Sequence, residues 1–282
     1  MDELAAKHVL LDFEIVTLIA LALGVASYVV VCRRCGNRID SSDVIRFDGF
    51  DLALMFFPAL LFLINPIAEL AVANGNLESS ETEEPSQVQS MLVHLGFMAF
   101  VGVMTYGINE WVRGRSVVKA FGLRRLTIPV IVMYSILGGV ASLLICLVFL
   151  GGISDALMES LFGGLEAQEP VRAFQSSESN FHFVISAVTA CTAAPVVEEF
   201  LFRGYMYGVV NRFTNPLFSA VITGALFAVV HGNLPALLPL WGFAILLSAA
   251  YEITKCLWVP IGIHAIFNIA NIVLMMRGDG VS

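Results

Sequence analysis

Long apolar stretches alternate with short polar segments along almost the whole chain. Eight of these stretches are about twenty residues long, enough for a helix to cross a hydrocarbon core about 30 Å thick. Within lipid each must be a helix, because an open chain would leave its backbone N–H and C=O groups unsatisfied. The pattern predicts an all-α polytopic membrane protein with spans at residues 14–31, 52–73, 91–110, 128–150, 181–203, 216–232, 235–252 and 257–276.

The composition agrees with a membrane location. Of the 282 residues, 58% are hydrophobic and 13% charged, whereas a soluble domain is about 25% charged. The net charge of -8 speaks against a nucleic-acid partner. A soluble globular enzyme and a nucleic-acid binder are therefore excluded, and the lipid bilayer is the expected surrounding.

The basic residues predict the orientation of the chain. Twelve of the fifteen Lys and Arg residues follow the first, third, fifth and seventh spans, and the exceptions are Lys7, Arg172 and Arg277. By the positive-inside rule these loops are cytoplasmic and both termini are external. The basic segment 113–125 is expected to lie at the cytoplasmic leaflet. Such segments usually act only as topology determinants, and specific lipid binding is the alternative.

Three regions follow from this topology. Residues 1–150 are predicted to form an N-terminal four-helix membrane region, residues 151–180 an acidic external loop, and residues 181–276 a transmembrane core that carries the chemistry.

Polar residues within spans are informative, because each costs several kcal/mol unless it is paired or functional. They gather in the second half of the chain. Three short motifs contain them: Glu198-Glu199-x-x-x-Arg203, Phe227-x-x-x-His231 and His264-x-x-x-Asn268, with Asn271 one turn further on. Counted from a predicted cytoplasmic turn near Phe213, all three motifs can meet in one layer within the membrane.

Helical phase separates the two glutamates. Glu199 and Arg203 stand at i and i+4 with the acid first, the favourable order for an ion pair within a helix. Glu198 points about 100° away and has no partner nearby in the sequence. We therefore expect Glu199 to be neutralised by Arg203 and Glu198 to be available for chemistry. Phe227 shares a helix face with His231 and is expected to line the site.

This set of side chains predicts a hydrolase. A glutamate with a histidine can deprotonate and orient a water for attack on a carbonyl, while a second histidine with an asparagine amide can donate to the oxyanion. The alternative is a zinc site in which Glu198, His231 and His264 are the ligands. We favour no cofactor, because His264 pairs with an amide donor at i+4, as an oxyanion hole requires.

The three motifs, in this order and with these spans between them, resemble those of the CAAX-protease and bacteriocin-processing family of intramembrane endopeptidases. The resemblance covers about residues 181–275 and implies an eight-helix glutamate-dependent endopeptidase with a cytoplasm-facing cavity. It implies that Glu198 and His231 activate the water and that His264 and Asn268 stabilise the oxyanion. Glu199 and Arg203 would hold the site together, and the partner would be a peptide or protein with a membrane-associated segment.

Two other functions fit the same residues. One is a non-catalytic scaffold or peptide-immunity protein that binds a peptide in the cavity. The other is a proton or ion transporter, which the absence of an inverted repeat in the sequence disfavours. The sequence leaves open the substrate, whether it is prenylated, and the oligomeric state.

Overall fold

The computed structural model describes residues 47–55, 87–162, 180–231, 233 and 235–277. In these ranges the regular structure is helical, with no strand. A short helix covers 49–55. The remaining elements are α3 (Gln87–Gly107), η1 (Ile108–Val112), α4 (Val117–Ala120), α5 (Ile128–Ser142), η2 (Leu143–Gly151), α6 (Gly152–Phe162), α8 (Asn180–Cys191), α9 (Ala193–Glu199), η3 (Phe200–Met206), α10 (Tyr207–Phe213), α11 (Pro216–Val229), α12 (Leu237–Thr254) and α13 (Trp258–Arg277).

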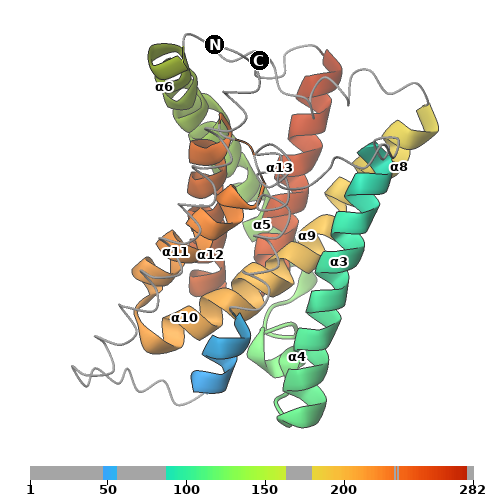
Figure 1. The fold of residues 1–282 in the computed structure, drawn as a ribbon, viewed down its shortest axis with the longest axis vertical. Helices are drawn as coiled ribbons and strands as arrows, with labels where there is room; N and C mark the ends of the chain where they lie inside the picture. Colours follow the sequence, from blue (N-terminus) through green and yellow to red (C-terminus); the bar gives the residue numbers. More distant parts are fainter. Residues whose placement is uncertain (1–46, 56–86, 163–179, 232, 234, 278–282) are drawn as a thin grey trace, which may run out of the picture.

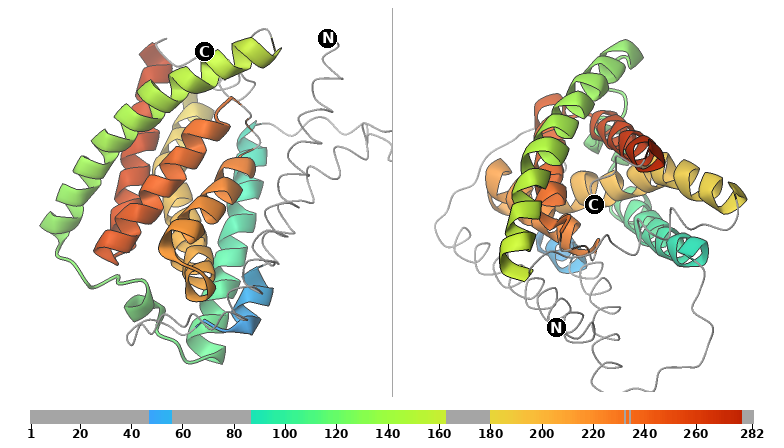
Figure 2. Two further views of the ribbon diagram at one scale, coloured as in Figure 1. Left: turned by 90° about the vertical axis from the view of Figure 1, so that its left-hand side faces the viewer. Right: turned by 90° about the horizontal axis from the view of Figure 1, so that it is seen from above.

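Two long helical runs frame the molecule. The elements α8, α9, η3 and α10 follow one another as a diagonal rod, with α3 packed along it (Figure 1). The elements α5, η2 and α6 form a second rod that packs against α12 and α13 (Figure 2). The helices α11, α12 and α13 lie between the two rods, so the residues of the three motifs come from neighbouring elements.

Four helical runs in the described residues are long and apolar enough to cross a membrane: Ile128–Ser160, Phe183–Phe213, Leu237–Thr254 and Trp258–Met276. They correspond to the fourth, fifth, seventh and eighth predicted spans, and the protein is an integral membrane protein. The helix α3 with η1 covers the third span. The first span, and the second beyond residue 55, lie outside the described residues.

The fourth span is longer than predicted. Its helix continues through Gly151 and Gly152 as α6 and ends at Phe162, beyond the predicted end near residue 150. Ser154 gives one reason, because its hydroxyl donates to the carbonyl of Pro235 at 2.6 Å and fixes α6 against the segment before α12.

The sixth span is shorter than predicted. The helix α11 begins at Pro216, with the Asn215 side chain accepting from the Phe218 backbone N–H, and its last residue is Val229. Its 14 residues measure about 21 Å at 1.5 Å per residue, which is less than the thickness of a hydrocarbon core. His231, predicted inside this helix, follows it in a turn.

The helix that carries both glutamates is irregular. It is interrupted at Thr192, whose backbone angles are not helical, and Pro195 supplies no N–H to the preceding turn. Directly after Glu199 the backbone becomes π-helical over η3. Turns of this kind occur mostly at functional sites, because they rotate the side chains that follow relative to a regular helix.

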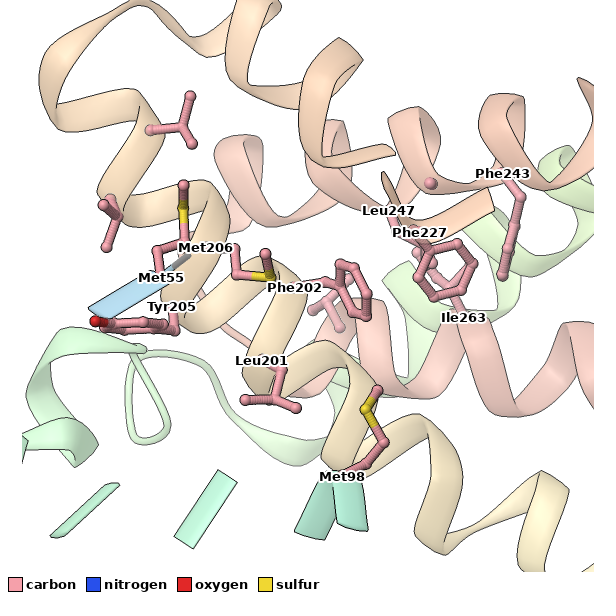
Figure 3. Packing of buried hydrophobic residues seen from close by; sticks show 14 of the residues in the cluster. Met55, Met98, Leu201, Phe202, Tyr205, Met206, Phe227, Phe243, Leu247 and Ile263 are labelled. Atoms are coloured by element: carbon pink, nitrogen blue, oxygen red, sulfur yellow. The ribbon is translucent and has the colours of Figure 1, made fainter. Parts of the chain in front are cut away.

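The core joins the elements that carry the motifs. Figure 3 shows Phe202 of η3, Phe227 of α11 and Phe243 of α12 among the buried hydrophobic residues. The rings of Phe202 and Phe227 meet edge to face with centroids 5.1 Å apart. Three helices distant in sequence are thus held together at Phe227, which is fully buried.

Ion pairs join the helix over 49–55 and the residue before it to the segment that follows η1. Arg115 Nη1 lies 2.8 and 2.9 Å from the two carboxylate oxygens of Asp51, whose side chain is fully buried. Arg113 donates to Asp48, and this guanidinium holds the pKa of Asp48 well below its ordinary value of 3.8. The Asp48 carboxylate is therefore expected to be ionised and paired at neutral pH.

Two glycines in the following loop provide a matched test of its packing. Both Gly114 and Gly122 have φ of +62°, but a Cβ at Gly114 meets open space, whereas one at Gly122 would overlap the carbonyl oxygen of Lys255. We expect Gly114→Ala to cost about 1–2 kcal/mol of unfolding free energy and Gly122→Ala about 3 kcal/mol or more. Denaturant unfolding in detergent measures both, and equal losses would contradict the close packing.

Candidate active site

The two adjacent glutamates occupy different environments at the end of α9. The side chain of Glu199 is fully buried, while that of Glu198 is 15% exposed. The difference follows from their directions, because consecutive residues of a helix point about 100° apart. Glu199 faces the interior of the bundle, and Glu198 keeps limited access to its surroundings.

Glu199 is the centre of a buried polar cluster. Its Oε1 accepts from Arg203 Nη1 at 2.9 Å, which is the predicted i,i+4 ion pair. The same oxygen lies 2.8 Å from Nδ1 of His264 on α13. The second contact was not predicted, because no sequence pattern linked His264 to Glu199. Glu199 therefore neutralises Arg203 and also orients the imidazole of His264.

His264 faces both glutamates at once. With Nδ1 against Glu199, its Nε2 points to Glu198 and lies 3.9 Å from Oε2 of that carboxylate. This separation is too long for a direct hydrogen bond. The Glu198 carboxylate and the His264 Nε2 come from different helices and thus lie on either side of one point. At this spacing both groups can contact a small reactant placed between them.

Arg203 and the aromatic rings form the walls around this cluster. The guanidinium is fully buried, lies 4.6 Å from the Phe227 ring centroid, and donates from Nη2 to the carbonyl of Ala244 at 3.2 Å. Phe243 meets the His264 ring edge to face at 5.2 Å. Phe243 and Ala244 both come from α12, and no polar signal in that apolar helix pointed to them.

Both histidines contact the same phenyl ring. The Phe227 centroid lies 4.5 Å from that of His231 and 5.9 Å from that of His264. His231 is exposed, and its Nδ1 lies 2.6 Å from the carbonyl oxygen of Phe227. The expectation that Phe227 lines the site agrees with these contacts, and the ring brings the second and third motifs together.

The two asparagines of α13 are engaged elsewhere. Asn268 Nδ2 donates to the carbonyl of Ala190 at 2.7 Å, next to the interruption at Thr192. Asn271 Nδ2 donates to the carbonyl of Phe267, one turn back in its own helix. In this conformation one hydrogen of the Asn268 amide supports the broken helix, which leaves its second hydrogen for another acceptor.

Several polar atoms of the cluster are buried without a hydrogen bond. Within the described ranges they are Oε2 of Glu198, Oε2 of Glu199 and Nε of Arg203. Buried polar atoms without partners are costly, and in native proteins they are uncommon. The unsatisfied oxygen of Glu198 is the atom that faces His264, so it is the natural point of contact for a water or a substrate.

A zinc ion was the alternative to a site without a cofactor. Among the residues described by the structure, no three or more His, Cys, Asp or Glu side chains are close enough to one another to hold one. The zinc alternative needs Glu198, His231 and His264 around one point, and with Nδ1 of each histidine against an oxygen within the protein, the nitrogen left for a metal would be Nε2.

The comparisons with known proteins point to the same region. Residues 180–270 match the model of the type II CAAX prenyl endopeptidase Rce1-like family. A Bacillus subtilis protein named "Putative membrane peptidase YdiL" is 28% identical over 143 residues, which are 51% of this chain and 57% of that protein. The chain thus spans a little over half the length of this relative. No solved structure matches this chain significantly. The part of the chain that carries Glu198, Glu199, His231, His264 and Asn268 is therefore similar to the Rce1-like family and to this membrane peptidase.

Proposed function

We propose that the protein is an intramembrane endopeptidase that hydrolyses a peptide bond near the C-terminus, or in a membrane-associated segment, of a protein or peptide. Similarity to the Rce1-like family and to a protein named as a membrane peptidase supports a protease in general. The specific proposal rests on one observation, that the Glu198 carboxylate and the Nε2 of His264 face each other at 3.9 Å from different helices.

Glu198 is proposed as the general base. Its buried, unsatisfied Oε2 takes a proton from a water, and the water oxygen attacks the carbonyl carbon of the substrate. The carbonyl electrons move to oxygen and form a tetrahedral oxyanion. When the C–N bond breaks, the carboxyl group of Glu198 returns the proton to the leaving amine. The products are a new carboxyl terminus and an amine, with no covalent enzyme intermediate.

His264 and Asn268 are proposed to stabilise the oxyanion. The formal charges of Glu198, Glu199 and Arg203 leave one negative charge in the cluster, which a protonated His264 balances. Its Nδ1–H then donates to Glu199, while its Nε2–H is directed at the reaction centre. The second amide hydrogen of Asn268 is the other donor, and each such donor contributes about 3–4 kcal/mol to transition-state stabilisation.

His231 is proposed to help position the water. Its ring lies against Phe227, and it is proposed to lie within the depth of the membrane because it follows the short helix α11. The orientation proposed is the predicted one, with both termini external and the site facing the cytoplasm. The substrate is proposed to enter from that side.

Chelation tests the metal-free mechanism. Purified protein in proteoliposomes is incubated with membrane-spanning and lipidated C-terminal reporter peptides, and the products are identified by mass spectrometry. We expect cleavage to continue at the untreated rate after exhaustive removal of divalent ions, because the proposed water activation uses only protein side chains. Activity that is lost on chelation and restored by Zn²⁺ would contradict this mechanism.

A further inference from the structure

The surface segment, residues 117–126, contacts both helices that carry the main site residues. Its apolar side chains point inward, and Val117 and Phe121 are buried. The Phe121 ring meets Phe200 edge to face at 5.1 Å, and Phe200 directly follows Glu199. The Phe121 carbonyl accepts from the backbone N–H of Leu257 at 3.0 Å, immediately before α13.

Gly122 makes the fit of the surface segment tight. Its backbone lies so close to the Lys255 carbonyl that no Cβ could be added. The surface segment therefore cannot shift without moving the corner between α12 and α13. Seven residues after Leu257, α13 presents His264, so the position of the surface segment and that of the imidazole are mechanically linked.

The outer side of the surface segment is positively charged. Lys119, Arg124 and Arg125 are exposed, and in the part of the chain that the structure describes none of the three forms an ion pair. The neighbouring Arg113 and Arg115, in contrast, are paired with Asp48 and Asp51.

These charges lie close to the start of a helical run that is long and apolar enough to cross a membrane. A 33-residue membrane span begins at Ile128, three residues after Arg125, and the side chain of Ile128 is 76% exposed. On the other side of the surface segment Trp111 is 78% exposed, as is usual for a tryptophan at a lipid interface. Cations held at this level meet the phosphate groups of the lipids.

We propose that Lys119, Arg124 and Arg125 bind anionic phospholipid headgroups, and that this binding stabilises the surface segment against Phe200 and Leu257 and so sets the geometry at His264. The occupant is the anionic leaflet because the three charges form no ion pair with the residues that the structure describes, and because they lie at the start of a helical run long and apolar enough to cross a membrane. The effect on peptide cleavage rests on the proposed function, whereas headgroup binding and its effect on Leu257 do not.

The first experiment measures headgroup binding in the otherwise intact Glu198→Gln protein. The protein is placed in nanodiscs of phosphatidylcholine with about 30 mol % phosphatidylglycerol. Two preparations are compared, one with brominated phosphatidylcholine and one with brominated phosphatidylglycerol, because bromine quenches tryptophan fluorescence. The fluorescence of Trp111 is obtained by subtracting the signal of the Trp111→Phe variant. We expect brominated phosphatidylglycerol to quench Trp111 more strongly than brominated phosphatidylcholine does, and the triple variant Lys119→Gln/Arg124→Gln/Arg125→Gln to lose this preference. Equal quenching by the two lipids would overturn headgroup binding.

The second experiment measures the coupling without relying on cleavage. Hydrogen exchange is followed for the peptide that contains Leu257, whose N–H donates to Phe121. We expect phosphatidylglycerol to slow this exchange by about fivefold or more in the starting protein and in Arg212→Gln, a control at an exposed arginine outside the surface segment. The triple variant should show no lipid effect. A lipid effect retained in the triple variant, or absent from the starting protein, would overturn the coupling.

Peptide cleavage by the wild type then provides a separate readout. We expect the same lipid to raise the cleavage rate by about fivefold, and the triple variant to cleave at the wild-type rate in phosphatidylcholine with no response to the anionic lipid. Lack of cleavage in every lipid would count against the proposed function alone, because the two preceding measurements decide headgroup binding and coupling.

Discussion

Replacing Glu198 by glutamine is expected to lower the rate of peptide cleavage by at least about a hundredfold while the bundle stays folded. Glutamine keeps the size of the side chain but cannot accept a proton from water. The change also removes a charge whose Oε2 is buried without a partner in the described structure, so stability should be unchanged or slightly increased. Cleavage in proteoliposomes and thermal unfolding in detergent measure the two effects.

Glu252→Gln is the matched control. Glu252 is also a glutamate in a membrane helix, but it accepts from the Tyr207 hydroxyl at 2.7 Å and pairs with Lys255 at the end of α12, away from the motifs. We expect the Glu252→Gln variant to cleave the peptide within about twofold of the wild-type rate. A wild-type rate in Glu198→Gln would remove Glu198 from the mechanism, and equal losses in both variants would mean that the assay reports folding.

Replacing Arg203 by methionine is expected to lower the free energy of unfolding by about 3–5 kcal/mol, because it leaves the fully buried Glu199 without its cation. The guanidinium also stacks on Phe227 and donates to Ala244. Its removal therefore loosens the contact between three helices. Denaturant unfolding in a mild detergent measures the loss.

A second substitution separates charge from packing. In the double variant Glu199→Gln/Arg203→Met no charge is left uncompensated between these two positions, so the loss should be smaller than the sum of the two single losses. Arg212→Met, at an exposed arginine of α10, should change stability by less than about 0.5 kcal/mol. A loss below about 1 kcal/mol for Arg203→Met would show that Arg203 does not neutralise Glu199.

Of the eight predicted spans, four are helical runs long and apolar enough to cross a membrane in the described part of the chain. Hydropathy finds them because lipid imposes one requirement on any helix of sufficient length, but it did not predict where the helices end. The fourth span was predicted to end at residue 150, yet the helix continues to Phe162. A contact distant in sequence, from Ser154 to Pro235, holds this extension. Helix ends set by such contacts are invisible to a local hydrophobic pattern.

The site shows the same limit. The Glu199–Arg203 pair was predictable because both residues lie on one helix at fixed spacing. The contact between His264 and Glu199 depends on how α13 is rotated against α9, which no spacing within a single helix specifies. Pro195 is a sequence signal for the interruption of this helix, because a proline inside a span indicates an interrupted helix. The interruption bears on the site, because the nearby backbone carbonyl of Ala190 accepts the hydrogen bond from the Asn268 amide.

The most direct measurement is a double-mutant cycle on the cleavage rate constant, with Glu198→Gln, His264→Ala and the double variant in the same proteoliposomes. If the two side chains act together on one water and one carbonyl, the double variant should be no more than about threefold slower than the slower single variant. Losses that multiply would show that Glu198 and His264 act independently, and would contradict a hydrolytic centre between them.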